Sequence, residues 1–492
     1  MTELVVVSFR GPVVHSRDES GRTQAGAASG GLVTGLLALP DLEDHGTWVC
    51  AAMTKEDRLV AEEGEVVVEV RGRKVAVRMV ALEPLAQHQT SAVAANPVLW
   101  FLQHELWDLG TNPTFARAEH AAFAGYAAVN AAFGDAVVQE LDRRSDDTVV
   151  MLHDYHLYLV AAHVRDQRPD AFLHHFVHIP WPPAETWRTL PTGIGEMLLR
   201  GLLANDVVAF HTEGYVRNFL DTCERVLSLP VDREQGLVFI DGRRVAVRWY
   251  PISLDPESLH AFARTEEVAQ ERAALQRSRP DQLVVRVDRA DPSKNVVRGF
   301  LAMDQLLVDH PELVGRVTML ALIQPTRTDV PQYQDYMAAI LRTAGEVNDR
   351  YGTEAWQPVD LRIGEGLARA VAAYQEADVL LVNPVRDGMN LVAKEGVLLS
   401  ERDAVLVLSH QAGVFEEIGA FSLGVHPLDV MDQAHALYRA LTMPREERGA
   451  RLRASRAVVE RNDAVRWLEM QLADVAQLRA QRPGDWERAL RP

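Results

Sequence analysis

Short apolar runs alternate with longer amphipathic stretches along the whole chain. Each run is rich in Val, Leu and Ile and nearly continuous, as expected for strands that are buried on both faces of a sheet. Strands are predicted at 4–8, 148–152, 172–177, 206–210, 245–250, 283–287, 317–323, 378–382 and 404–408. Helices are predicted between them, at 115–142, 194–204, 213–227, 296–309, 332–348 and 367–376. This alternation predicts an α/β fold with parallel sheets.

The pattern divides the chain into two halves of similar size. Residues 250–252 close the first block of strands, and a polar helical stretch at about 256–279 separates it from the second block. We therefore expect two doubly wound domains, at 1–255 and 256–461, with a final helix at about 462–480 that packs back on the first domain. In such proteins ligands bind at the carboxyl ends of the strands, in the crevice between the domains.

Composition excludes several classes of protein. The chain has 492 residues, and its 51 Lys and Arg against 69 Asp and Glu give a net charge of −18. This balance argues against a nucleic-acid partner and against a polybasic membrane-surface protein. Two cysteines, Cys50 and Cys223, are too few for a disulfide framework and favour a reducing compartment. With no secretory signal and no run of about 18 apolar residues, we expect a cytoplasmic protein; assembly into a homo-oligomer stays open.

The string RDGMNLVAKE at 386–395 follows a predicted strand and opens a predicted helix. A strand-to-helix turn with a small residue leaves free backbone N–H groups and a positive dipole end, which together form an anion site. Asp387 at the turn could bind sugar hydroxyls, and Glu395, about two helical turns later, could hold a ribose diol. The alternative is that Asp387 caps the helix and that Glu395 is a solvated helix residue.

A second polar string, VDRADPSKN at 287–295, also follows a predicted strand. Its two cations, Arg289 and Lys294, could clamp a diphosphate. An acidic protein needs positive groups in its cleft to attract an anionic substrate. The alternative is that both cations are surface charges paired with Asp288 and Asp291.

Further candidates lie elsewhere in the chain. Arg10 follows the first strand, and a loop with Gly30 and Gly31 comes soon after it. Paired glycines let the backbone approach a phosphate or sugar closely, although such a loop is usually only a turn. Arg327, in the string PTRTDV, is a third candidate cation.

Two histidine-containing strings, HDYHL and HIPWP, end neighbouring strands of the first half. Polar groups at strand ends fit a cleft site. A metal site built from His153, Asp154, His156 and His178 is disfavoured, because no helical His-x-x-x-His pair and no cysteine ligand accompanies them.

Taken in order, HDYHL, HIPWP, VDRADPSKN, PTRTDVPQYQ and RDGMNLVAKE resemble the trehalose-6-phosphate synthases of glycosyltransferase family 20. The resemblance extends from Arg10 to about Leu478. It implies a GT-B fold, with two Rossmann-like domains, a cleft between them and a C-terminal crossover helix. It also implies transfer of glucose from a nucleotide sugar to glucose 6-phosphate, with the α configuration retained and without a metal or other cofactor.

The resemblance also implies roles for individual residues. Arg289 and Lys294 would hold the donor diphosphate, and Asp154 would lie between donor and acceptor. The implied catalytic residues are Asp154, His178, Arg289, Lys294 and Asp387. The implied donor site consists of Gly30, Gly31, Arg289, Lys294, Asp387, Gly388, Met389, Asn390, Leu391, Val392 and Glu395. The implied acceptor site consists of Arg10, Trp100, Asp154 and Arg327.

The chain also departs from the family pattern. Ser91 falls where the family usually has a Tyr on the acceptor phosphate, and Phe9 replaces the Asn of Ser-Asn-Arg. The usual Asp-Tyr-Ser-Lys-Gly reads Asp-Pro-Ser-Lys-Asn at 291–295. Residues that read a base would lie near 324–327 and 358–366, and the second of these segments resembles the family poorly. We therefore expect that the donor is not restricted to UDP-glucose and that GDP-glucose is also a good donor.

Three functions compete at this point. The first is a trehalose-6-phosphate synthase that works by front-face attack, with Asp154 as the only candidate nucleophile for a double displacement. The second is a pseudo-glycosyltransferase or relative with a different acceptor, such as a cyclitol phosphate. The third is a sugar-phosphate sensor without activity. The complete RDGMNLVAKE string favours the synthase.

Overall fold

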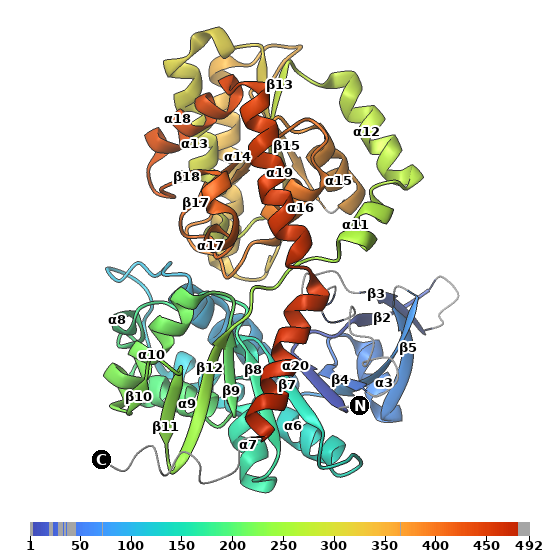
Figure 1. Cartoon of the computed structure of the whole chain (residues 1–492), viewed down its shortest axis with the longest axis vertical. Coiled ribbons are helices and arrows are strands. Elements are labelled where there is room, and N and C mark those ends of the chain that lie inside the picture. The colour runs from blue at the N-terminus through green and yellow to red at the C-terminus, as the bar shows by residue number, and fades with distance from the viewer. Residues whose placement is uncertain are drawn as a thin grey trace.

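The strands of the computed structural model assemble into two large sheets, which define an N-terminal and a C-terminal lobe. The structure describes residues 3–18, 23–27, 33, 36, 46–70, 72–364 and 366–480. Figure 1 shows the C-terminal lobe above the N-terminal lobe, each with helices packed around its sheet. The α/β class predicted from the alternating pattern is confirmed.

The N-terminal lobe contains a ten-stranded sheet and a separate two-stranded hairpin. The strands of the sheet are β1 (Leu4–Ser8), β4 (Gly46–Ala51), β5 (Glu65–Val70), β6 (Arg73–Val80), β7 (Val149–His153), β8 (Phe172–Phe176), β9 (Val207–Phe210), β10 (Val231–Asp232), β11 (Leu237–Ile240) and β12 (Arg243–Trp249). The hairpin joins β2 (Val13–Arg17) to β3 (Thr23–Ala27). The strand order is β10-β11-β12-β9-β8-β7-β1-β4-β6-β5, and only the pairs β5–β6, β10–β11 and β11–β12 are antiparallel.

Helices cover both faces of this sheet. They are α3 (Lys55–Glu63), α4 (Pro84–Gln89), α5 (Trp100–Gln103), α6 (Arg117–Leu141), α7 (Val160–Gln167), α8 (Ala184–Trp187), α9 (Thr192–Leu202) and α10 (Glu213–Leu227), with helical segments η1 (Thr90–Leu99) and η2 (Tyr155–Leu157). Of the described helices, α6 alone is long and apolar enough to cross a membrane by length and composition, and over half of its apolar window is buried inside the lobe. This burial is typical of a core helix.

The C-terminal lobe has a six-stranded sheet in which every strand pair is parallel. Its strands are β13 (Gln282–Arg289), β14 (Val317–Gln324), β15 (Val359–Ile363), β16 (Val379–Val382), β17 (Val405–Ser409) and β18 (Leu423–Val425). Its helices are α11 (Pro256–Phe262), α12 (Glu266–Ser278), α13 (Val296–Asp309), α14 (Pro331–Tyr351), α15 (Leu367–Glu376), α16 (Leu391–Leu399), α17 (Phe415–Ile418), α18 (Val430–Thr442) and α19 (Arg445–Arg461), with short segments η3 (Pro292–Lys294), η4 (Pro311–Leu313) and η5 (Gly419–Phe421). One core cluster contains α13, α14 and α18, and another contains α15 and α16, so these helices cover opposite faces of the sheet.

Both sheets follow the doubly wound strand order in which the first strand lies between the second and the fourth. The order is β15-β14-β13-β16-β17-β18 in the C-terminal lobe and β6-β4-β1-β7-β8-β9 in the middle of the N-terminal sheet. The winding direction reverses between β13 and β16 in one lobe and between β1 and β7 in the other. Ligands of such sheets bind at the carboxyl ends of the strands at these reversal points.

The last helix, α20 (Ala464–Ala480), leaves the C-terminal lobe and packs along the N-terminal lobe (Figure 1). The Tyr250 hydroxyl donates to Asp474 at 2.7 Å, and Arg479 donates to the backbone carbonyl of Asp147 at 2.6 Å. The Trp467 ring lies against that of Phe176, with centroids 5.3 Å apart. The predicted crossover helix is therefore present, although it begins two residues later than the predicted 462.

Candidate active site

The candidate residues follow the strands at which both sheets reverse direction. Arg10 and Asp154 follow β1 and β7, whereas Arg289 and Asp387 lie at the carboxyl ends of β13 and β16. The residues that follow β16 contact the N-terminal lobe directly, because the Tyr215 hydroxyl of α10 donates to the backbone carbonyl of Asp387 at 2.8 Å. The fold thus brings distant parts of the sequence to one junction.

Gly388 lies where the backbones of the two lobes approach each other closely. A Cβ at this position would lie 2.1 Å from the carbonyl oxygen of His178 and 3.2 Å from the Cα of Ile179. A Cβ on Gly413 would in turn lie 2.0 Å from the carbonyl oxygen of Gly388. These neighbours are backbone atoms, so no side-chain rotation makes room, and glycine is required at position 388.

Lys294 and Asp387 form one ion pair, in which the ammonium contacts carboxylate oxygen Oδ2. The same oxygen accepts from the side-chain amide of Asn390 at 2.9 Å. Burial alone raises the pKa of Asp387, but the Lys294 charge and hydrogen bond outweigh it and hold that pKa below its usual range. The pair therefore places one positive and one negative charge beside the first turn of α16.

The helix cap at this turn differs from the alternative considered for the sequence. The side chain of Asn390, with φ 81°, accepts from the backbone N–H of Ala393 at 3.1 Å, so Asn390 and not Asp387 caps α16. Glu395 is not a freely solvated helix residue, because the Tyr374 hydroxyl donates to it at 3.1 Å and burial raises its pKa to about 7. The two N–H groups of α16 that precede the capped one have no acceptor within the helix and can donate to an anion.

The aspartates between the two loop cations pair with other arginines. Asp288 contacts Arg286 at 2.7 Å, and Asp291 contacts Arg327 at 2.7 Å. The alternative in which Asp288 and Asp291 neutralise the loop cations is therefore wrong. Arg289 is exposed, and within the described part of the chain it has no ion-pair partner; its guanidinium lies 5.7 Å from the Trp100 ring. Arg289 is thus a charge available to a ligand.

Asp154 has an unusual backbone conformation at the end of β7. Its φ of 75° and ψ of 170° are costly for a residue other than glycine, and such strain concentrates at functional sites. One carboxylate oxygen accepts from the backbone N–H of His178 at 3.4 Å. Burial raises the pKa of Asp154 to about 6.

His178 lies in a cluster of aromatic rings. Its Nε2 is 3.1 Å from Nδ1 of His153, and its ring stacks on Phe176 with centroids 4.6 Å apart. Trp467 of α20 lies at 6.2 Å. Burial lowers the pKa of His178 well below its usual value, so the imidazole is neutral at neutral pH.

The candidate acceptor residues form a second cluster. The guanidinium of Arg327 lies 4.1 Å from the Trp100 ring centroid, and it donates to the Tyr155 hydroxyl at 3.2 Å. The charges of Arg327 and Arg10 add to burial in lowering the pKa of His156 to about 3, which places both cations near this ring. Ser91, which replaces the usual Tyr, donates to the backbone carbonyl of Gln87 at 2.9 Å. Gly30 and Gly31 lie outside the described residues.

The sequence model of glycosyltransferase family 20 matches residues 2–477. The chain belongs to glycosyltransferase family 20. It is 31% identical over 456 residues to a UDP-forming alpha,alpha-trehalose-phosphate synthase of Schizosaccharomyces pombe, covering 91% of this chain and 85% of the relative.

Solved structures of family-20 proteins share the whole fold. The Escherichia coli trehalose-6-phosphate protein bound with UDP-2-fluoro glucose has a TM-score of 0.83 and 30% identity, over 98% of this chain and 100% of that one. A UDP-forming synthase of Burkholderia xenovorans in complex with glucose-6-phosphate has a TM-score of 0.80 and 28% identity, over 96% and 100%. The predicted GT-B fold is confirmed.

Three residues of this family-20 junction escaped the sequence analysis: Asp291, Tyr155 and Tyr333. Each is buried, and each contacts Arg327. The signal for Asp291 was its place between Arg289 and Lys294, but a buried acid bound to a distant arginine looks like a surface acid in sequence. Among the described residues, no group of three or more His, Cys, Asp and Glu side chains is arranged to hold a metal ion.

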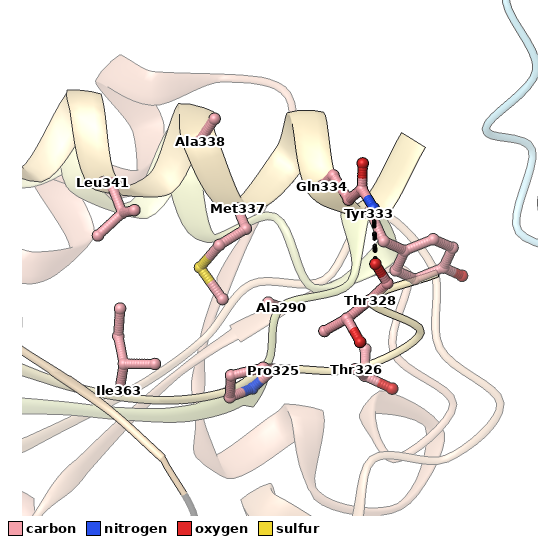
Figure 2. Close-up of a pocket in the computed structure, with 10 residues that line it drawn as sticks. All are labelled: Ala290, Pro325, Thr326, Thr328, Tyr333, Gln334, Met337, Ala338, Leu341 and Ile363. Atoms are coloured by element: carbon pink, nitrogen blue, oxygen red, sulfur yellow. Dashed lines mark hydrogen bonds between the residues drawn. The ribbon is translucent and has the colours of Figure 1, made fainter. Parts of the chain in front are cut away.

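A mainly apolar pocket of about 410 Å³ lies between α14 and the ends of β14 and β15. Figure 2 shows Met337 pointing from α14 into the space beside Pro325 and Ile363. These two residues come from the loops expected to read a base. However, the pocket opens on the α14 side of the sheet, whereas Tyr374 and Glu395 lie on α15 and α16, which cover the other face.

Proposed function

We propose that the chain transfers glucose from a nucleoside-diphosphate glucose to glucose 6-phosphate and forms α,α-trehalose 6-phosphate. The observation that supports this best is the junction itself. The C-terminal lobe presents Arg289 and the Lys294–Asp387 pair at the start of α16, and it presents a further cation, Arg327, over the Trp100 ring of the N-terminal lobe. Several cations around one junction suit two phosphorylated substrates that react with each other.

In this proposal the C-terminal lobe holds the donor. Arg289, Lys294 and the backbone amides at the turn into α16 bind the diphosphate, Asp387 binds the transferred glucose, and Glu395 binds the ribose. These amides belong to Gly388, Met389 and Asn390 in the turn and to Leu391 and Val392 at the start of α16. The N-terminal lobe supplies His178 to the glucose, and Arg10, Trp100 and Arg327 bind the acceptor.

We propose front-face attack as the mechanism. The bond between the anomeric carbon and the diphosphate oxygen breaks as the bond to the acceptor hydroxyl oxygen forms on the same face. The departing oxygen takes the hydroxyl proton, and Arg289 and Lys294 stabilise the negative charge on the diphosphate. Because these cations supply the charge that a metal would supply, the reaction is proposed to need no metal. Asp154 lies at the junction and orients the reacting groups.

The proposed donor range includes GDP-glucose as well as UDP-glucose. The support comes from the sequence, because 358–366, near which a base would be read, resembles the family poorly. The N1–H and N2–H₂ donors of guanine suit a carboxylate or backbone carbonyl acceptor, whereas uracil offers one N3–H donor. A UDP-glucose preference of tenfold or more in kcat/KM, about 1.4 kcal/mol, would contradict this part of the proposal.

One assay tests the whole proposal. The protein is mixed with glucose 6-phosphate and UDP-, GDP- or ADP-glucose, with and without a chelator, and products are identified by mass and NMR. An α,α-linked disaccharide phosphate in the presence of chelator is expected. The chain is also 30% identical over 503 residues to a validamine 7-phosphate valienyltransferase of Streptomyces hygroscopicus, so a cyclitol phosphate acceptor is included. Binding without product would favour the sensor.

A further inference from the structure

Asp291 lies between the two donor-lobe cations and is wholly buried. It precedes η3, two residues after Arg289 and three before Lys294, and its side chain is 0% exposed. Oxygen Oδ1 accepts from the backbone N–H of Ser293 at 2.9 Å and from its hydroxyl at 2.7 Å. These two bonds fix the carboxylate within its own loop.

The remaining contacts of this carboxylate reach the acceptor residues. Oδ2 contacts Nη1 of Arg327 at 2.7 Å, and Oδ1 accepts from the indole N–H of Trp100 at 3.2 Å. Trp100 belongs to the N-terminal lobe, so the second contact crosses the lobe junction. One carboxylate therefore holds both the guanidinium and the ring that stack on each other at 4.1 Å.

The carboxylate of Asp291 is ionised, which strengthens its contact with Arg327. Despite its burial, the cations Arg327 and Arg289 lower its pKa to about 2, so it is ionised throughout the physiological range. An ionised carboxylate accepts charge-assisted hydrogen bonds from a guanidinium in a fixed direction. A free arginine side chain at the junction would otherwise sample many rotamers, and ordering it would weaken ligand binding.

We propose that Asp291 is a positioning residue that fixes Arg327 and Trp100 in the geometry that binds the acceptor phosphate. The inference rests on the proposed function, because it takes glucose 6-phosphate as the ligand of this cluster. Asp291 does not touch the acceptor itself, since both of its oxygens are already occupied by protein donors.

The position of Asp291 also links the two substrates. Arg289 and Lys294, which take the donor diphosphate in the proposed function, lie two and three residues from Asp291, so a shift of this segment on donor binding would reach Arg327 and Trp100 through Asp291. Glucose 6-phosphate that binds more tightly when nucleoside diphosphate is present, and by linkage the reverse, would show this coupling. Loss of the Asp291 carboxylate should remove it.

The test is calorimetric titration of the full chain with UDP, with GDP, and with glucose 6-phosphate in the presence and absence of each nucleotide. Asp291→Asn keeps the shape of the side chain but presents an amide to Arg327. Asp288→Asn is the matched control, because it is the same change three residues earlier, near the end of β13, at a carboxylate bound to Arg286. Ser293→Ala is a milder variant that removes one bond to Asp291 and buries no new polar group.

In D291N, glucose 6-phosphate affinity is expected to fall at least tenfold while nucleotide affinity stays within about threefold. S293A should show a smaller loss of the same kind, and D288N should keep acceptor affinity within about threefold. The indole ¹⁵N–¹H signal of Trp100, identified with Trp100→Phe, should shift in D291N without any substrate.

Two outcomes overturn the proposal separately from the proposed function. Folded D291N that binds glucose 6-phosphate like the wild type overturns the positioning role alone. Equal losses of nucleotide and acceptor affinity in D291N and D288N point to general loop damage and also overturn it. Wild-type protein that binds nucleotide but no glucose 6-phosphate instead contradicts the proposed function, and the inference falls with it. If D291N does not fold, an unchanged acceptor affinity in S293A decides against the proposal.

Discussion

Lys294 and Asp387 form an ion pair with each other in the protein without substrate. Their side chains are both 13% exposed, so the pair is largely shielded from water. Removing one member of such a pair leaves an uncompensated charge in a place of low dielectric. Arg289 presents the opposite case, because it is exposed and its charge is solvated. Lys294 and Arg289, although assigned to the same diphosphate, thus differ in how much they contribute to the stability of the folded protein.

Substituting each cation with alanine should separate these contributions. Both Arg289→Ala and Lys294→Ala should lose about 2–4 kcal/mol of transition-state stabilisation. Only Lys294→Ala should also lower the free energy of unfolding, by about 2–4 kcal/mol, because Asp387 loses its counter-ion; Arg289→Ala should change it by less than about 0.5 kcal/mol. Activity assays and urea unfolding measure the two effects. Equal unfolding energies in the two variants would contradict the ion-pair argument.

The raised pKa of Glu395 predicts that donor binding depends on pH. Burial raises its pKa to about 7 from an ordinary 4.5, so in the folded protein it ionises as the pH rises through 7. A carboxylate accepts two ribose hydroxyls, so UDP or GDP affinity should rise over about pH 6 to 8. The stability contribution has the opposite direction: it is greatest below pH 4.5 and declines until the pH passes 7.

Glu395→Gln serves as the control for this prediction, because glutamine keeps the shape and does not titrate. Its nucleotide affinity should be lower than that of the wild type at pH 8 and should rise less steeply with pH, because only the terminal phosphate of the nucleotide still titrates. Calorimetry at several pH values makes the comparison. A wild-type nucleotide affinity that falls with rising pH would contradict the assignment of Glu395 to the ribose.

At the level of single residues, the sequence predicts the functional candidates that follow strand ends, but it does not predict which side chains they contact. Arg327 was a candidate because it lies in a recognisable string, yet its contact with Asp291 joins residues 36 positions apart. The Trp100–Asp291 contact joins residues 191 positions apart, in different lobes. Such pairs depend on how two sheets meet, and no local pattern encodes that.

At the scale of elements, the pattern finds most of the fully buried strands, although it misses β4, which is buried throughout. The predicted helices at 213–227 and 296–309 appear with the same bounds as α10 and α13. The strands β5 and β6 were missed because their residues alternate between buried and exposed at the edge of the sheet, with charged residues in between. The turn before α16 was recognised, but the reason for its glycine lies in the other lobe.

Gly388→Ala tests this contact between elements. The new Cβ would lie 2.1 Å from the His178 carbonyl oxygen, so the lobes must separate, and we expect a loss of about 1–3 kcal/mol or more together with most of the activity. Gly345→Ala is the matched control, because Gly345 lies in α14 with nothing within 4 Å of its Cβ position. That change should stabilise the protein by about 0.5–1 kcal/mol. Normal activity in G388A would refute the close approach.

The crossover helix contributes one large side chain to the site region. Trp467 is 1% exposed and lies against Phe176 and His178, so Trp467→Ala should destabilise the protein by about 3–5 kcal/mol. It should also lower kcat, because His178 loses a neighbouring ring. Trp249→Ala, at a residue that is 44% exposed, should change stability by no more than about 0.5 kcal/mol. Unfolding curves compare the two, and equal losses would contradict the packing role.

For the whole molecule, the polar contacts between the lobes and the crossover helix predict that both lobes unfold together. Scanning calorimetry should give a single transition, and a nucleoside diphosphate at about 100 times its Kd should stabilise the whole of it by about 2.7 kcal/mol. Two transitions, of which only one shifts with nucleotide, would show that the lobes are independent.

The chain crosses between the lobes twice, and the two crossings are bonded to each other. The backbone N–H of Ala464, at the start of α20, donates to the carbonyl of Leu254 at 2.8 Å. A single linker would leave rotation about several axes free. Two linkers bonded side by side permit opening about one axis and resist twisting. Each time the lobes close, Asp154 and Asp387 therefore return to the same alignment, without a search over orientations.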